Sequence, residues 1–398
     1  MDFERVHTYF EQVLHTETIA GPRTRLIVFN GGPEFASYAQ AASVRGFYQS
    51  SPDGDFIVLP SLKGDVMPVA AHEYAHLFFR RTGRRYPLWL SDGLAEYFST
   101  VTPQRDGLRI GAPPPERARA LGFGVRLMPL ERLFAVTRDS IEYTAPKSAS
   151  LFYAQSWALA HLLVTDPRYR DLAPAFFARL ARDEPAGLAF TTVYRANIDE
   201  LGRDLTRYTL RGNYRTTTMQ VDALPAILSA TPRASTSFEA GVVLASLLGA
   251  NPARESQAQA AFDALEQENR VDVQLLEAIA LFDVRRQNLT AARPYLDRAI
   301  AAHSQLGRIF VYAAESRRLS ASATGDPDPD DERLLATALA LAPDDVEVHL
   351  VAAQRRITER RPADALALLA PFTRVPVEYE KLVDDTRALA QRLIKTPR

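Results

Sequence analysis

Hydrophobic and polar positions follow two different periods along the first 100 residues. Short apolar runs bounded by turn residues predict strands at 25–30, 46–49 and 55–60, the last two joined by the turn sequence SSPDG. Apolar residues with helical spacing predict helices at 69–80 and 89–101. Because strands and helices are mixed here, we expect an α+β domain.

Strand signals largely end at about residue 127. Helical patterns follow at 148–164, 172–182 and 198–210, and the stretch after residue 215 has prolines and no clear period. We therefore place a linker at 216–235, which divides the chain into a first domain, 1–215, and a second domain, 236–398.

The second domain is predicted to be helical and repetitive. A set of three apolar residues recurs after 34 positions: Ala258, Phe262 and Leu265 are followed by Ala292, Leu296 and Ala299. The pattern continues at 338–343 and at Ala365 and Leu369, after the insertion SASATGDPDPDD. This period, with small residues at helix crossings, resembles tetratricopeptide repeats. An irregular helical bundle is the alternative, and the segment 377–394 is expected to cap the stack with a more polar face.

The composition of the chain limits which partners it is expected to bind and where in the cell it is expected to be. The chain has 398 residues, 47 basic against 48 acidic side chains and no cysteine. The balanced charge gives no reason to expect nucleic acid as a partner, and no apolar run is long enough for a transmembrane segment. Residues 1–15 have the pattern of an amphipathic helix and not of a signal peptide. The protein is thus expected to be either exported, with its signal removed, or cytoplasmic.

The sequence HEYAH at residues 72–76 carries the strongest chemical signal. His72 and His76 lie one helical turn apart, so both imidazoles can reach one metal ion. Glu73 is rotated away from them and can act as a general base. The alternative is a core helix whose histidines are satisfied by hydrogen bonds.

A third metal ligand must be a carboxylate or a histidine, because the chain has no cysteine. Asp92 and Glu96 lie four residues apart in WLSDGLAEYFS and therefore share one face of the predicted helix. A short loop after the first helix can place this face against the histidines. The alternative is that both are ordinary surface acids.

HEYAH followed by PLWLSDGLAEYFS resembles the gluzincin metallopeptidases, and most of all the bacterial peptidase-MA-like proteins, over roughly residues 1–215. The resemblance implies a thermolysin-like zincin fold, a Zn²⁺ cofactor and a peptide or protein substrate. It also implies that Glu73 is the general base and that Asp55–Leu59 form the strand edge that holds the substrate. Such domains are often fused to tetratricopeptide repeats, which here would bind a protein partner.

The sequence departs from the family at its acidic ligand. Asp92 stands where the family has glutamate, and its carboxylate has about 1.5 Å less reach. Asp92 can ligate after a small helix shift, with Glu96 orienting a histidine, or Glu96 can itself extend to the metal. By resemblance, Tyr153 would stabilise the oxyanion; its alternative is a packing role, and His161 is a weaker candidate for the site.

Two functions from different classes follow. The first is zinc-dependent hydrolysis of peptide bonds, with endo- or exopeptidase action left open. The second is a catalytically inactive peptidase-like scaffold in which Asp92 has disabled the site and the helical repeats bind a partner. Metal content distinguishes the two.

Overall fold

The computed structural model describes most of the chain, which separates into two compact units. The first unit comprises 1–19, 24–48 and 56–229, and the second comprises 20–23, 49–55 and 230–398. The described residues are 7, 10, 11, 18–19, 21–39, 45–61, 66–104, 107–122, 124–220, 234–320 and 329–395. The amphipathic helix expected at 1–15 lies mostly outside them.

The strands and the helices up to residue 211 make a mixed α and β architecture, as expected. The strands are β1 (Thr24–Val28), β2 (Phe47–Ser51), β3 (Gly54–Leu59), β4 (Thr102–Gln104), β5 (Gly107–Ile110) and β6 (Thr217–Gln220). The helices are α2 (Gly32–Ala36), α3 (Met67–Arg81), α4 (Leu88–Phe98), α5 (Pro115–Ala120), α6 (Leu130–Phe134), α7 (Ile141–Thr144), α8 (Pro146–Thr165), α9 (Ala173–Leu180), α10 (Ala186–Tyr194) and α11 (Ile198–Arg211).

The first sheet has the strand order β1–β3–β2. Every residue of β3 is buried, which fits its apolar sequence and its central position. The expectation that Asp55–Leu59 form the sheet edge beside the candidate site is therefore wrong. A two-residue turn folds β2 back beside β3 and makes β2 an edge of the described sheet.

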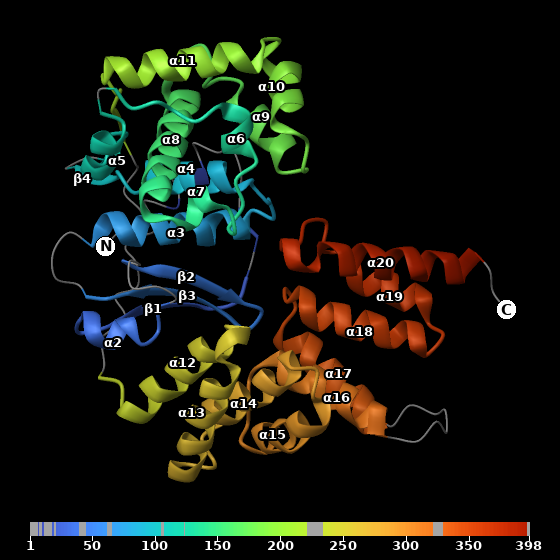
Figure 1. The fold of residues 1–398 in the computed structure, drawn as a ribbon. Helices are drawn as coiled ribbons and strands as arrows, with labels where there is room; N and C mark the ends of the chain where they lie inside the picture. The colour runs from blue at the N-terminus through green and yellow to red at the C-terminus, as the bar shows by residue number, and fades with distance from the viewer. Residues whose placement is uncertain are drawn as a thin grey trace. The chain divides into compact units, whose positions relative to one another are not determined.

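Helix α3 packs directly on this sheet. Ile57 and Leu59 alternate along β3 and contact Ala70 and Leu77, which lie on one face of α3. Pro68 lies in the first turn of α3, where its missing N–H costs no hydrogen bond. Figure 1 shows α3 lying along the sheet, with α4 and α8 on its other side.

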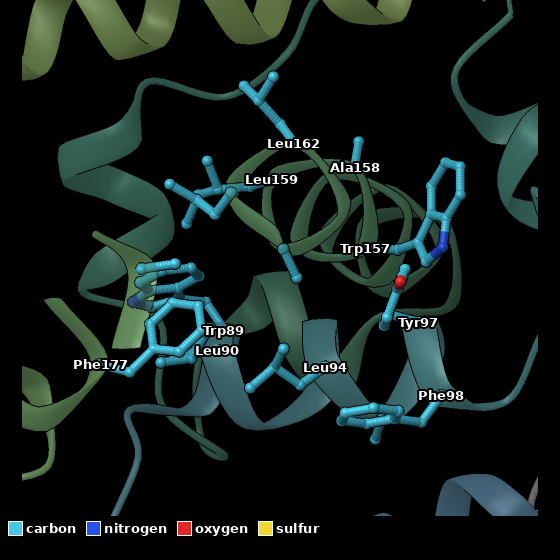
Figure 2. Close-up of a cluster of buried hydrophobic side chains, with 14 of the residues drawn as sticks. Trp89, Leu90, Leu94, Tyr97, Phe98, Trp157, Ala158, Leu159, Leu162 and Phe177 are labelled. Atoms are coloured by element: carbon cyan, nitrogen blue, oxygen red, sulfur yellow. The ribbon is translucent and has the colours of Figure 1, made fainter. Parts of the chain in front are cut away.

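Helices α4 and α8 form the centre of the first core. Trp89, Leu90 and Leu94 of α4 lie toward Leu159 of α8, and Tyr97 lies toward Trp157; all of these side chains are buried (Figure 2). The helices meet closely at Gly93, where an added Cβ would lie 2.8 Å from the carbonyl carbon of Ser156. The close approach fixes where the acidic residues of α4 lie.

A second small sheet was not predicted from the sequence. Strands β4, β5 and β6 pair in that order, and both pairs are antiparallel. Strand β6 lies within 216–235, where the sequence analysis placed a linker. Its residues TTMQ are too short and too weakly patterned to identify a strand without their partner β5.

The second unit is built largely from helices, which pack as consecutive pairs. They are α12 (Ser237–Gly249), the short 3₁₀ helix η1 (Pro252–Arg254), α13 (Glu255–Glu268), α14 (Val273–Arg285), α15 (Leu289–Ala301), α16 (Gly307–Ser320), α17 (Pro329–Leu341), α18 (Val346–Thr358), α19 (Pro362–Leu369) and α20 (Val377–Lys395). Within each pair the two helices contact each other, and the first helix also contacts the first helix of the next pair.

The 34-residue pattern marks the buried face of each second helix. Ala258 and Phe262 of α13 correspond to Ala292 and Leu296 of α15, and all four are buried. Ala338 of α17 is also buried, as are Ala365 and Leu369 of α19. Helix α20 follows the last pair, but its exposed side is not wholly polar, since Leu382, Leu389 and Leu393 are exposed.

No helix among the described residues combines the length and apolar character needed to cross a bilayer.

Candidate metal centre

The two histidines of HEYAH converge on one point. His72 and His76 lie one turn apart on α3, and their Nε2 atoms are 3.2 Å from each other. Both side chains are partly buried, on the side of α3 that faces α4. Two ring nitrogens this close can share a hydrogen bond when one of them is protonated, or act together as a pair of metal ligands.

Asp92 completes a three-residue group. Its Oδ1 lies 3.5 Å from Nε2 of His76, and one donor atom from each of His72, His76 and Asp92 lies within 4.8 Å of the others. The group can hold a metal ion. Ser91 Oγ is 3.3 Å from Nδ1 of His76, while Nε2 of that ring faces His72 and Asp92.

Asp92 has an unused oxygen in a buried position. The residue is 3% exposed, and its Oδ2 has no hydrogen-bond partner among the described atoms. A buried carboxylate oxygen without a partner is costly, and a cation at this point would satisfy it. The donor set of two imidazoles and one carboxylate therefore fits a metal ion.

Glu96 lies beside the group but is held by another residue. Its Oε1 is 3.7 Å from Nδ1 of His72, on the side of the ring away from Nε2. Both carboxylate oxygens accept hydrogen bonds from Arg117, Nε to Oε2 at 2.9 Å and the terminal nitrogen to Oε1 at 2.7 Å. Sequence analysis missed Arg117, because it lies on the short helix α5 with no motif around it.

Glu73 points toward the sheet edge. Its Oε2 accepts a hydrogen bond of 2.8 Å from the backbone N–H of Tyr48 on β2. The side chain is thus placed between the histidine pair and the edge strand. The sequence predicts that Glu73 is rotated away from the two histidines, but only the tertiary structure shows that it meets the backbone of β2.

Tyr153 lies on α8 beside Arg117. The guanidinium carbon of Arg117 is 5.0 Å from the centre of the Tyr153 ring, and the Tyr143 ring lies 5.7 Å from it on another side. Burial, and then the charge of Asp92, raises the pKa of Tyr153, so its phenol remains a hydrogen-bond donor at neutral pH.

Burial keeps both histidines neutral. It lowers the pKa of His72 to about 4, with a further contribution from the charge of Arg117. It lowers that of His76 to about 3, assisted by His72 and by the charge of Arg138. A neutral imidazole has the lone pair that a metal ion requires.

The carboxylates of the site shift in the opposite direction. Burial, and then the charge of Glu96, raises the pKa of Asp92 to about 7. Burial also raises the pKa of Glu73 to about 8, opposed in part by the Tyr48 hydrogen bond and supported by the charges of Asp92 and Glu96. The centre is therefore short of positive charge, which a dication would supply.

His161 does not belong to this group. It is fully buried in α8, where Nε2 is 2.9 Å from the carbonyl oxygen of Gly111 and Nδ1 is 2.7 Å from the hydroxyl of Tyr208. Both ring nitrogens are thus used in hydrogen bonds that hold α8 to its neighbours. The residue is structural.

Comparison with known proteins gave no match: no family model, no curated protein and no solved structure is matched by this chain. The geometry of the site is therefore the basis for proposing a function.

Proposed function

We propose that this chain is a zinc-dependent peptidase. The observation that carries the proposal is the convergence of His72, His76 and Asp92 on one point, with Glu73 adjacent on the same helix. Two imidazoles and one carboxylate are a ligand set found at catalytic zinc sites, and three protein ligands leave one position open.

Each residue of the centre has a role in the proposed hydrolysis. His72, His76 and Asp92 hold Zn²⁺, which when bound would polarise the scissile carbonyl and lower the pKa of a bound water. Glu73 accepts the proton of the attacking water and passes it to the leaving nitrogen. Tyr153 donates a hydrogen bond to the oxygen on which negative charge develops.

The edge strand β2 is the proposed holder of the substrate backbone. Tyr48 on β2 bonds to Glu73, so a peptide paired with this edge would pass close to the general base. In this proposal β2 takes the substrate-holding role that the family resemblance implied for Asp55–Leu59.

The helix pairs of the second unit are proposed to bind a protein partner or a part of the substrate distant from the cleaved bond. Stacked helix pairs form extended surfaces suited to this purpose.

Metal content and peptide cleavage test the proposal together. Protein purified without chelator should contain about one zinc per chain, as a three-ligand catalytic site does. It should also cleave a peptide library or an unfolded protein. Glu73→Gln should retain zinc and lose at least about 100-fold in rate. Glu268→Gln, an exposed position on α13, is the matched control and should change neither.

Substitution of Asp92 separates the enzyme from the scaffold. Asp92→Asn should weaken zinc binding by more than the roughly 100-fold expected for loss of an outer-shell partner. A competition titration with a chromophoric chelator measures this. If the unsubstituted protein contains no zinc and cleaves nothing, the peptidase proposal fails and the inactive scaffold is the better account.

A further inference from the structure

A second carboxylate, Glu96, lies beside the candidate metal group without belonging to it. Glu96 follows Asp92 by one turn on α4, and its Oε1 lies 3.7 Å from Nδ1 of His72, the ring nitrogen that does not face His76. The side chain is buried, so water cannot compensate its charge. By residue type and helix face, Glu96 is suited to become a fourth ligand.

Arg117 holds Glu96 in another position. Its guanidinium donates to both carboxylate oxygens, at 2.7 and 2.9 Å, in the planar two-bond geometry that lysine cannot form. The same group lies 5.0 Å from the centre of the Tyr153 ring, which restricts its movement. Arg117 is itself mostly buried, with its side chain 19% exposed.

We propose that Arg117 is a positioning residue that keeps Glu96 off the metal and thereby keeps one coordination position open for water and substrate. The inference rests on the proposed function, because it requires His72, His76 and Asp92 to hold a metal. It also explains why a site with two suitable carboxylates need not become a closed four-ligand site.

The consequence of removing Arg117 follows from charge. Glu96 would then be a buried carboxylate without its partner, and a metal ion held by His72, His76 and Asp92 would be a positive charge close to it. The side chain has enough rotatable bonds to turn toward it. Arg117→Ala should therefore convert an open metal site into a closed one.

Cobalt substitution and azide binding test this directly. Co²⁺ is loaded into the full chain, and the visible absorption spectrum is recorded with and without azide, which requires an open coordination position. The unsubstituted protein should show an azide-dependent shift, and Arg117→Ala should bind Co²⁺ but lose that shift. The double variant Arg117→Ala, Glu96→Gln should regain it, because an amide is a much weaker ligand.

Two further variants act as controls. Arg119→Ala removes an exposed arginine from the same helix and should leave the azide shift unchanged. Arg117→Lys keeps the charge without the two-bond geometry and should show a partial loss. It also serves if Arg117→Ala does not fold.

The experiment distinguishes failure of the proposed metal site from failure of the proposed role of Arg117. If the unsubstituted protein gives no cobalt spectrum, the metal site itself is wrong. If it binds Co²⁺ and azide normally while Arg117→Ala and Arg117→Lys do the same, only the role of Arg117 is overturned. Loss of the shift in Arg117→Ala that Glu96→Gln fails to restore also overturns it, since Glu96 is then not the ligand that closes the site.

Discussion

Asp92 and Glu347 are both buried carboxylates, yet their pKa values move in opposite directions. For Asp92, burial and the charge of Glu96 raise the pKa to about 7. For Glu347 on α18, burial acts in the same sense, but the charges of Arg285 and Arg308 outweigh it and lower the pKa to about 2. The arginines paired with Glu347 favour its charged form, whereas at Asp92 the charges of Arg138 and Arg117 do not offset burial and the charge of Glu96.

Glu347 should make the second unit sensitive to acid. Its folded pKa of about 2 is lower than the ordinary value of 4.5, so its stabilising contribution is present above pH 4.5 and is lost as the pH falls toward 2. The difference corresponds to roughly 3 kcal/mol of unfolding free energy. Glu347→Gln should lower stability at pH 7 and flatten its decline over this range, as measured by urea unfolding at several pH values.

The matched control is Glu380→Gln on α20, whose side chain is exposed. It should leave both the stability at pH 7 and the acid decline unchanged. If Glu347→Gln gives the same pH profile as the unsubstituted protein, the arginine pairs do not stabilise this carboxylate.

Among the elements, the contact between α4 and α8 does most to place the candidate centre. Asp92 and Glu96 project from α4, and Gly93 between them lets the backbone of α8 approach closely at Ser156. The large apolar residues of the two helices then bury one another (Figure 2). The position of Asp92 beside the two histidines therefore depends on the packing of α4 and not only on its local helix.

Gly93→Ala should separate these helices. The new Cβ would lie 2.8 Å from the carbonyl carbon of Ser156, so the backbone of one helix must shift. We expect a loss of about 1–3 kcal/mol in unfolding free energy, together with weaker metal binding. Thermal unfolding followed by circular dichroism, with a zinc titration, measures both.

Gly187→Ala is the comparison for this substitution. Gly187 is also helical, in α10, but nothing lies within 4 Å of its added Cβ, so no loss of stability is expected. Equal effects of the two substitutions would show that the α4–α8 contact is not tight at Gly93.

For the whole molecule, the important feature is that each unit has its own buried cores. The proposed metal ligands lie in the first unit, whose main core includes α4 and α8. The helix pairs of the second unit bury separate clusters around Ala292, Leu296 and Phe262. Ligand binding stabilises only the structure that forms the site.

Zinc should therefore protect the first unit selectively. At a free zinc concentration of 1,000 times its dissociation constant, the gain is about 4 kcal/mol for the folded state that binds it. Hydrogen–deuterium exchange with mass spectrometry should show slower exchange in α3, α4 and α8 when zinc is added. Peptides from α14 to α19 should be unchanged, and uniform protection of both units would contradict the expectation.

The pattern of apolar and polar residues within one segment was sufficient to predict several helices. The helix with His72 and His76, the second helix with Asp92, and the buried positions of the helix pairs all follow from periodicities within one segment. The pair of imidazoles in HEYAH, one helical turn apart, is likewise visible within residues 72–76 alone. These features depend on neighbours in the chain, so the sequence alone determined them.

The tertiary structure decided which distant groups meet. The order β1–β3–β2 put β2 and not β3 at the edge, β6 found its partner β5 more than a hundred residues away, and Arg117 came to hold Glu96. The hairpin of β2 and β3 has a local signal in its turn, but the place of β1 beside β3, the pairing of β5 with β6 and the contact of Arg117 with Glu96 have none, since each depends on packing between separate segments. The sequence contained the candidate ligands, and the fold decided that Asp92 lies with the two histidines while Glu96 pairs with Arg117.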